Sequence, residues 1–89
     1  MEFSVLMSVY YKENPEYLKL SLDSVIKQTV PATEIVLIKD GPLTKELDDI
    51  INQYGDKYAG LFRVFSLEEN VGLGKALNYG VQCCKYDLI

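Results

Sequence analysis

Glu34-Ile35-Val36-Leu37-Ile38-Lys39-Asp40-Gly41 is the stretch that decides the fold. Its four successive apolar residues, with no polar residue alternating between them, are typical of a strand that is buried on both faces of a parallel sheet. The turn residues that follow Lys39 end this strand. Similar strand-forming segments cover residues 3–10 and 61–67. The sequence therefore predicts three strands of one sheet.

Helices are predicted between these strands. Asn14-Pro15 begins the first helix, because asparagine caps a helix and proline fits its first turn, and Thr44 caps the second. Apolar residues at helical spacing predict a core-facing stripe on each helix: Leu18, Leu22, Val25 and Ile26 on the first, Leu47, Ile50, Ile51, Tyr54 and Tyr58 on the second, and Leu73, Ala76, Leu77, Gly80, Val81 and Cys84 on the third.

The alternation of strands and helices predicts an α/β fold. It has three layers, α/β/α, with a mostly parallel sheet joined by right-handed crossovers. Tyr86-Asp87-Leu88-Ile89 is predicted to open a fourth strand. Because the chain has only 89 residues, we expect it to form a single partial domain, residues 1–89.

Charge and composition narrow the classes of function. The net charge of -4 gives no reason to expect nucleic acid or an anionic membrane as a partner. No apolar run approaches the roughly 20 residues of a membrane span, and no basic stretch precedes an apolar one at the N-terminus, so we expect a cytoplasmic protein. Cys83 and Cys84 are adjacent and no histidine is present, which predicts reduced thiols and no metal site in this sequence.

Polar residues follow the carboxyl ends of the predicted strands, where open α/β sheets bind their ligands. The carboxylate of Asp40 can accept hydrogen bonds from a nucleotide base, or it can simply form the turn. Tyr10 and Tyr11 can lie against a base, or they can cover the core. Lys75 begins a helix where anions are favoured, so it can meet a diphosphate or be an ordinary exposed lysine. We expect Tyr10, Asp40 and Lys75 to share one rim.

Two common phosphate motifs do not fit. Gly72-Leu73-Gly74-Lys75-Ala76 is similar to the end of a P-loop, but Ala76 replaces the hydroxyl residue that binds magnesium and the earlier glycine is missing. A dinucleotide-binding fingerprint would need a third glycine at Leu77 and usually follows the first strand.

Four segments together resemble the N-terminal half of the family 2 glycosyltransferases, which are nucleotide-sugar enzymes of the GT-A fold. Residues 4–11 are similar to the family's first strand and nucleotide-contacting loop, and residues 20–29 to its first helix. Residues 34–41 are similar to the second strand with its base-binding aspartate, and residues 70–80 to the Asn-x-Gly segment and the following helix. The resemblance covers essentially the whole chain and implies a truncated GT-A domain.

The resemblance implies a set of substrate-binding residues. Asp40 would contact the base, and Lys75 would approach the nucleotide. Together with the residues that border the nucleotide, the set is Val9, Tyr10, Glu13, Asp40, Gly41 and Lys75. Leu77 stands where many members carry arginine, so we assign no cationic role there.

The resemblance also implies a bound metal ion, but the motif that binds it is absent from this sequence. The family places an Asp-x-Asp motif beyond the strand that would begin at Tyr86, where its carboxylates hold Mg²⁺ or Mn²⁺ against the diphosphate. That motif and the later general base are absent from the 89 residues, so no catalytic and no metal residue is assigned.

We therefore expect the donor-binding segment of an inverting glycosyltransferase. It would serve transfer of a sugar from a UDP- or dTDP-sugar to a hydroxyl of a saccharide or lipid-linked acceptor, in cell-envelope polysaccharide biosynthesis. We expect the isolated chain to be a weak or inactive catalyst, and the parent protein to be cytoplasmic or peripheral to the inner face of the membrane. An unfilled sheet edge at Leu88-Ile89 would favour self-association.

Two alternatives stay open. One is a non-catalytic nucleotide-binding or oligomerising module that keeps the fold without the chemistry. The other is a phosphoacceptor domain with Asp40 as the modified group, although such a site needs clustered acids that the end of the first strand does not supply.

Overall fold

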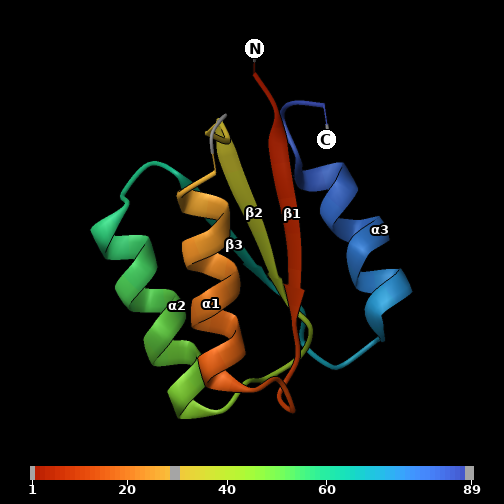
Figure 1. Ribbon diagram of the computed structural model, residues 1–89. Coiled ribbons are helices and arrows are strands. Elements are labelled where there is room, and N and C mark those ends of the chain that lie inside the picture. The colour runs from red at the N-terminus through yellow and green to blue at the C-terminus, as the bar shows by residue number, and fades with distance from the viewer. Residues whose placement is uncertain (1, 29–30, 88–89) are drawn as a thin grey trace.

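The computed structural model describes residues 2–28 and 31–87, and in these residues three strands alternate with three helices (Figure 1). In chain order the elements are β1 (Ser4–Val9), α1 (Pro15–Ile26), β2 (Glu34–Lys39), α2 (Lys45–Lys57), β3 (Phe62–Ser66) and α3 (Leu73–Cys83). The predicted order of elements is confirmed, and each strand is slightly shorter than its predicted segment.

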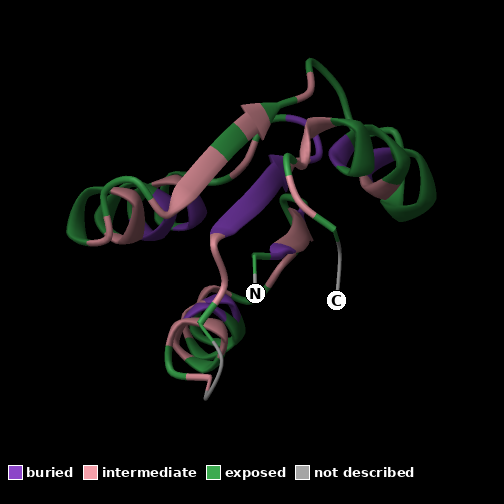
Figure 2. Ribbon diagram, turned by 90° about the horizontal axis from the view of Figure 1, so that it is seen from above, coloured by how far each residue is buried: buried purple, intermediate pink, exposed green. Residues whose placement is uncertain are grey.

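The sheet is parallel throughout, with β2 between β1 and β3. The four apolar side chains of β2 are completely buried, as the sequence predicted: Ile35, Val36, Leu37 and Ile38. Figure 2 shows this buried strand at the centre of the molecule. The inner residues of β1 are only partly buried, because within the described residues β2 is its only partner strand.

Helices cover both faces of the sheet, which confirms the three-layer α/β/α architecture. α1 and α2 lie on one face and α3 lies on the other (Figures 1 and 2). Successive β2 side chains point to opposite faces. Leu37 therefore packs in the larger core with the leucines and isoleucines of α1 and α2, while Val36 and Ile38 pack with Ala76 of α3. Within the described residues no helix is long and apolar enough to cross a membrane.

The three helices begin differently. The side-chain oxygen of Asn14 accepts a hydrogen bond from the Glu16 N–H at 2.9 Å, and the Thr44 hydroxyl accepts one from the Leu47 N–H at 3.3 Å. These are the caps that the sequence predicted for α1 and α2. Gly72 precedes α3 and offers no side chain as a cap.

The predicted core stripe of α3 is wrong at Leu73 and Val81. Both side chains are at least half exposed, at 64% and 50%. The helix instead approaches the sheet through Ala76 and Gly80, where a side chain on Gly80 would collide with Leu6. The close contact with the sheet is thus made by the smallest residues of the predicted stripe.

The predicted fourth strand is not formed at Tyr86 and Asp87, and Leu88 and Ile89 lie outside the described residues. The chain nevertheless returns to β1 after α3. The Ser4 N–H of β1 donates a hydrogen bond of 2.9 Å to the carbonyl of Asp87. α3 thus carries the chain back across the sheet to the edge of β1 that β2 does not occupy.

A buried carboxylate holds this return segment. Glu34 accepts hydrogen bonds of 2.6 Å from the Ser4 hydroxyl and the Lys85 N–H, and one of 3.1 Å from the Arg63 guanidinium. Arg63 also donates to the carbonyl of Cys83 at 2.7 Å. Burial alone would raise the pKa of Glu34, but the hydrogen bonds and the Arg63 charge outweigh it and hold the pKa below its usual value of 4.5.

Glu34→Gln should therefore destabilise the fold in a pH-dependent way. At pH 7 we expect a loss of about 2 kcal/mol in the free energy of unfolding, because hydrogen bonds to a charged acceptor are lost. A pKa that is lower in the folded state makes this contribution complete above pH 4.5 and lost as the pH falls through the folded-state value.

Urea unfolding between pH 7 and pH 3 would measure the difference between wild type and variant. The difference should narrow below pH 4.5, whereas the exposed Glu68→Gln control should stay near wild type at every pH. A difference that remains constant down to pH 3 would contradict this account.

Candidate functional site

The path of the chain places a crevice at the carboxyl ends of β1 and β2. α1 and α2 take the chain across one face of the sheet from β1 to β3, and α3 brings it back across the other face to β1. Ligands of open α/β sheets bind where the direction of winding changes, outside the carboxyl ends of the strands.

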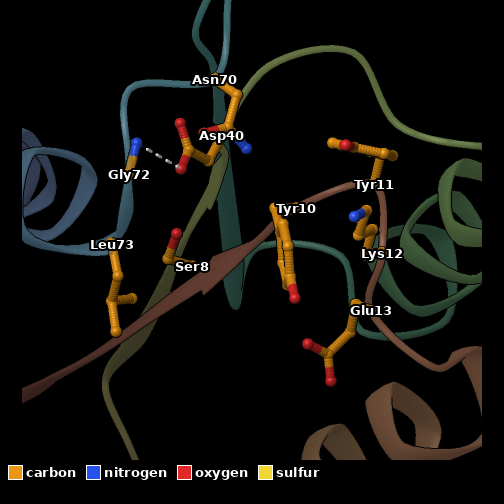
Figure 3. A pocket seen from close by; sticks show the side chains of 9 residues that line it. All are labelled: Ser8, Tyr10, Tyr11, Lys12, Glu13, Asp40, Asn70, Gly72 and Leu73. Carbon is orange, nitrogen blue, oxygen red and sulfur yellow. Dashed lines mark hydrogen bonds between the residues drawn. The ribbon is translucent and has the colours of Figure 1, made fainter.

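A pocket of about 690 Å³ lies at this place (Figure 3). Its lining comes from the end of β1, the turn after it, the residue after β2, the loop before α3 and the first residue of α3: Ser8, Tyr10, Tyr11, Lys12, Glu13, Asp40, Asn70, Gly72 and Leu73. The volume falls within the range of about 300–1,000 Å³ that is usual for small-molecule sites.

One wall of the pocket is a tight turn after β1. The Glu13 N–H donates to the carbonyl of Tyr10 at 3.0 Å, which closes the turn. The rings of Tyr10 and Tyr11 meet edge to face with centroids 6.0 Å apart, and the Lys12 ammonium lies 5.8 Å from the Tyr11 centroid. Both rings are more than 40% exposed, so they form the surface of the pocket rather than a cover over the core.

The opposite wall is the loop before α3, and Asp40 forms the floor between this loop and the turn after β1. It is only 2% exposed, and its N–H donates to the carbonyl of Val9 at 2.8 Å. Its carboxylate accepts hydrogen bonds from the Val71 N–H at 2.8 Å and the Gly72 N–H at 3.1 Å. Figure 3 shows the carboxylate turned toward Gly72. Each carboxylate oxygen can accept more than one hydrogen bond, so Asp40 keeps acceptor capacity for a ligand.

Gly41 permits the close approach of the loop to the end of β2. Its φ of +88° lies in the region that favours glycine, and a Cβ there would lie 2.7 Å from the backbone nitrogen of Asn70. A side chain at this position would therefore strain the backbone and also collide with Asn70.

The predicted site residues divide into two groups. Tyr10, Glu13 and Asp40 line the pocket together. Val9 and Gly41 are buried and are not among the lining residues, although the core residue Val9 supports Asp40 through its carbonyl. Lys75 is exposed on the first turn of α3 and is not among the lining residues, so the expected common rim holds Tyr10 and Asp40 without it.

Several lining residues were not assigned from the sequence. Ser8 is a polar residue within the apolar strand β1, next to the last strand residue, and this was a usable signal. Leu73 was predicted to be in the core, and no local signal marks it as part of a pocket.

The pocket does not gather the ligands of a metal ion. Glu13 and Asp40 are the carboxylates of the lining, and no group of three metal-binding side chains occurs among residues 2–28 and 31–87. These residues alone do not fit a divalent metal.

Comparison with known proteins identifies the family. The sequence model described as Glycosyl transferase family 2 matches residues 4–89. The chain belongs to glycosyl transferase family 2. The three-stranded parallel sheet and its three helices fit the first part of the α/β GT-A domain that the sequence resembles.

Three similar curated relatives of this glycosyltransferase chain are bacterial. It is 42% identical to the UDP-Gal:alpha-D-GlcNAc-diphosphoundecaprenol beta-1,3-galactosyltransferase of Escherichia coli, covering 99% of this chain and 31% of the relative. It is 44% identical to an uncharacterized glycosyltransferase of Haemophilus influenzae, covering 100% and 33%. It is 41% identical to the amylovoran biosynthesis glycosyltransferase AmsE of Erwinia amylovora, covering 98% and 32%. The chain thus spans about a third of the length of these relatives, and no solved structure matches it.

Gly41→Ala should test how the floor of the pocket depends on the close approach of the loop. The alanine would add backbone strain and a collision with Asn70, so we expect a loss of about 3 kcal/mol or more in stability. Gly60→Ala is a matched control, because Gly60 has a φ of +90° but open space around it. It should cost only about 1–2 kcal/mol. Equal losses for the two variants in urea unfolding would show that the contact with Asn70 is unimportant.

Proposed function

We propose that this chain binds the nucleotide part of a sugar donor for a family 2 glycosyltransferase. The pocket at the carboxyl ends of β1 and β2 is the observation that carries the proposal. It combines an exposed aromatic ring, Tyr10, with a buried carboxylate, Asp40, in a crevice of suitable size. Family membership supports sugar transfer as the general activity of the protein to which this segment corresponds.

The pocket can hold a nucleotide through complementary contacts. The free acceptor positions of Asp40 would take a hydrogen bond from the N–H of a base, while the Tyr10 ring would lie against the base plane. Glu13 borders the same space, the carbonyl of Val9 holds the backbone of Asp40, and Gly41 lets the loop before α3 approach. Lys75 stands on the first turn of α3, from which its long side chain would approach the diphosphate.

The chemistry of transfer needs groups beyond these 89 residues. We propose that the parent enzyme inverts the configuration of the transferred sugar, and that Mg²⁺ or Mn²⁺ would neutralise the departing diphosphate. Because the described residues contain no metal-binding group, we expect the 89-residue chain alone to be a weak or inactive catalyst.

The names of two relatives support the proposed classes of donor and acceptor. The Escherichia coli relative is named for a UDP-galactose donor and a diphosphoundecaprenol-linked acceptor, and the Erwinia relative for amylovoran biosynthesis. We therefore propose a UDP- or dTDP-sugar donor, a saccharide or lipid-linked acceptor, and a role in cell-envelope polysaccharide synthesis. We also propose that the parent protein works in the cytoplasm, where a lipid-linked acceptor would bring it to the inner face of the membrane.

The sheet edge expected at Leu88-Ile89 lies outside the described residues, and the outer edge of β3 offers a second route to self-association. Within the described residues the outer edge of β3 has no partner strand, and unpaired strand edges can join between copies. Sedimentation over a range of chain concentrations would detect such a dimer, and a monomer at every concentration would refute it.

Nucleotide titration tests the donor site. We expect UDP or dTDP to shift the amide NMR signals of pocket residues, and Tyr10→Ala to weaken binding about tenfold, since stacking of a base on an aromatic ring contributes about 1–3 kcal/mol. Tyr17→Ala is the matched control, because Tyr17 is equally aromatic, 63% exposed and outside the pocket lining. The proposal fails if no nucleoside diphosphate shifts these signals, or if both variants bind equally.

A further inference from the structure

We propose that Asp40 is also a positioning residue, which holds the N-terminal end of α3 in place and so shapes one wall of the pocket. This inference goes beyond the proposed function, because it concerns the protein with no nucleotide bound. It rests on the hydrogen bonds of Asp40, on the missing cap of α3, and on a matching arrangement at the other end of the same helix.

The carboxylate of Asp40 binds two successive N–H groups from a segment 31 and 32 residues away in the sequence. Consecutive backbone N–H groups form a natural concavity for an anion. Val71 and Gly72 immediately precede α3, where the positive end of the helix dipole favours a negative charge. The first turn of α3 carries no acidic residue, so Asp40, which follows β2, supplies the negative group that the helix lacks in its own sequence.

α3 packs on the sheet mainly through small residues, with Cys83 and Cys84 partly buried against the same core. Its buried residues are Ala76 and Gly80, whereas α2 buries Leu47, Ile50 and Ile51. Small side chains remove little apolar surface from water, so α3 gains less from burial than α2 does. The position of α3 on the sheet therefore depends more on polar contacts at its two ends than the position of α2 does.

The other end of α3 is held in the same way. Glu34, the first residue of β2, accepts the N–H of Lys85 just after the helix, and Asp40, the residue after β2, accepts the two N–H groups just before it. The buried carboxylates at the two ends of one strand thus hold the two ends of one helix. Only the Asp40 end borders the pocket, through Asn70, Gly72 and Leu73.

Asp40→Asn is the informative change because it nearly preserves shape. The amide keeps one acceptor oxygen and places an NH₂ group opposite a backbone N–H, so one of the two hydrogen bonds is replaced by two facing donors. Amide hydrogen exchange, measured by NMR without nucleotide, should speed up at Val71 and Gly72 by roughly tenfold or more relative to amides in β2.

Two controls separate positioning from loss of charge and from general destabilisation. Glu69→Gln removes the same charge from an exposed residue of the same loop and should leave exchange at Val71 and Gly72 unchanged. Glu34→Gln should speed exchange at Lys85. In that variant, exchange at Val71 and Gly72 should rise no more than exchange at the β2 amides does. If exchange at Val71 and Gly72 in Asp40→Asn matches that of wild type, the positioning role is overturned.

A measurement on the wild-type chain covers the case in which Asp40→Asn does not fold. Scalar couplings across hydrogen bonds should connect the amide nitrogens of Val71 and Gly72 to the carboxyl carbon of Asp40. Their absence from the folded wild-type protein would overturn the proposal. Neither readout involves a nucleotide, so failure of the donor-site titration leaves this inference standing, and the reverse also holds.

Discussion

Burial of β2 between two layers of helices is the constraint on which the rest of the structure depends. Its four apolar side chains are completely removed from water, and each fully buried side chain of this size contributes about 1.5–3 kcal/mol. A strand in that position must have its backbone hydrogen bonds satisfied on both sides, which β1 and β3 do by parallel pairing. Parallel pairing in turn requires crossovers, and the helices of these crossovers bury the two faces.

The same burial places a carboxylate out of contact with water at each end of β2. Glu34 and Asp40 are carboxylates at 3% and 2% exposure, and a buried carboxylate is stable only when its oxygens are hydrogen-bonded. Both find backbone N–H groups at the ends of α3. One buried strand thereby places the helix that returns along the opposite face, and the pocket arises between that helix and the turn after β1.

Local signals predicted the elements well because the relevant physics is local. The apolar run of β2 and the caps Asn14 and Thr44 depend on a few neighbouring residues, and all three occur as predicted. The stripe of α3 failed at Leu73 and Val81, because spacing identifies an apolar face but not which residues the sheet reaches. The family resemblance that those segments suggested is confirmed over residues 4–89.

The candidate site was harder to predict, because it is made by contacts between distant segments. Asp40 was singled out from its place after a strand, but its hydrogen bonds to Val71 and Gly72 depend on a loop whose path no local pattern describes. Ser8 and Leu73 enter the pocket for the same reason. Lys75 carried the expected charge, yet its position on α3 leaves it outside the lining, since charge alone does not determine where a helix points a side chain.

The two walls of the pocket are held by different forces, and this difference bears on how the site can adapt. The turn after β1 is closed by one backbone hydrogen bond between neighbours, so its shape depends mainly on its own residues. The opposite wall is held by the carboxylate of Asp40, which directly follows another strand, β2, and also faces the pocket. A group that binds Asp40 therefore acts on the same carboxylate that fixes the start of α3, whereas a group that contacts only Tyr11 or Lys12 does not. Contact with the floor therefore reaches the ligand space and the start of α3 through one carboxylate.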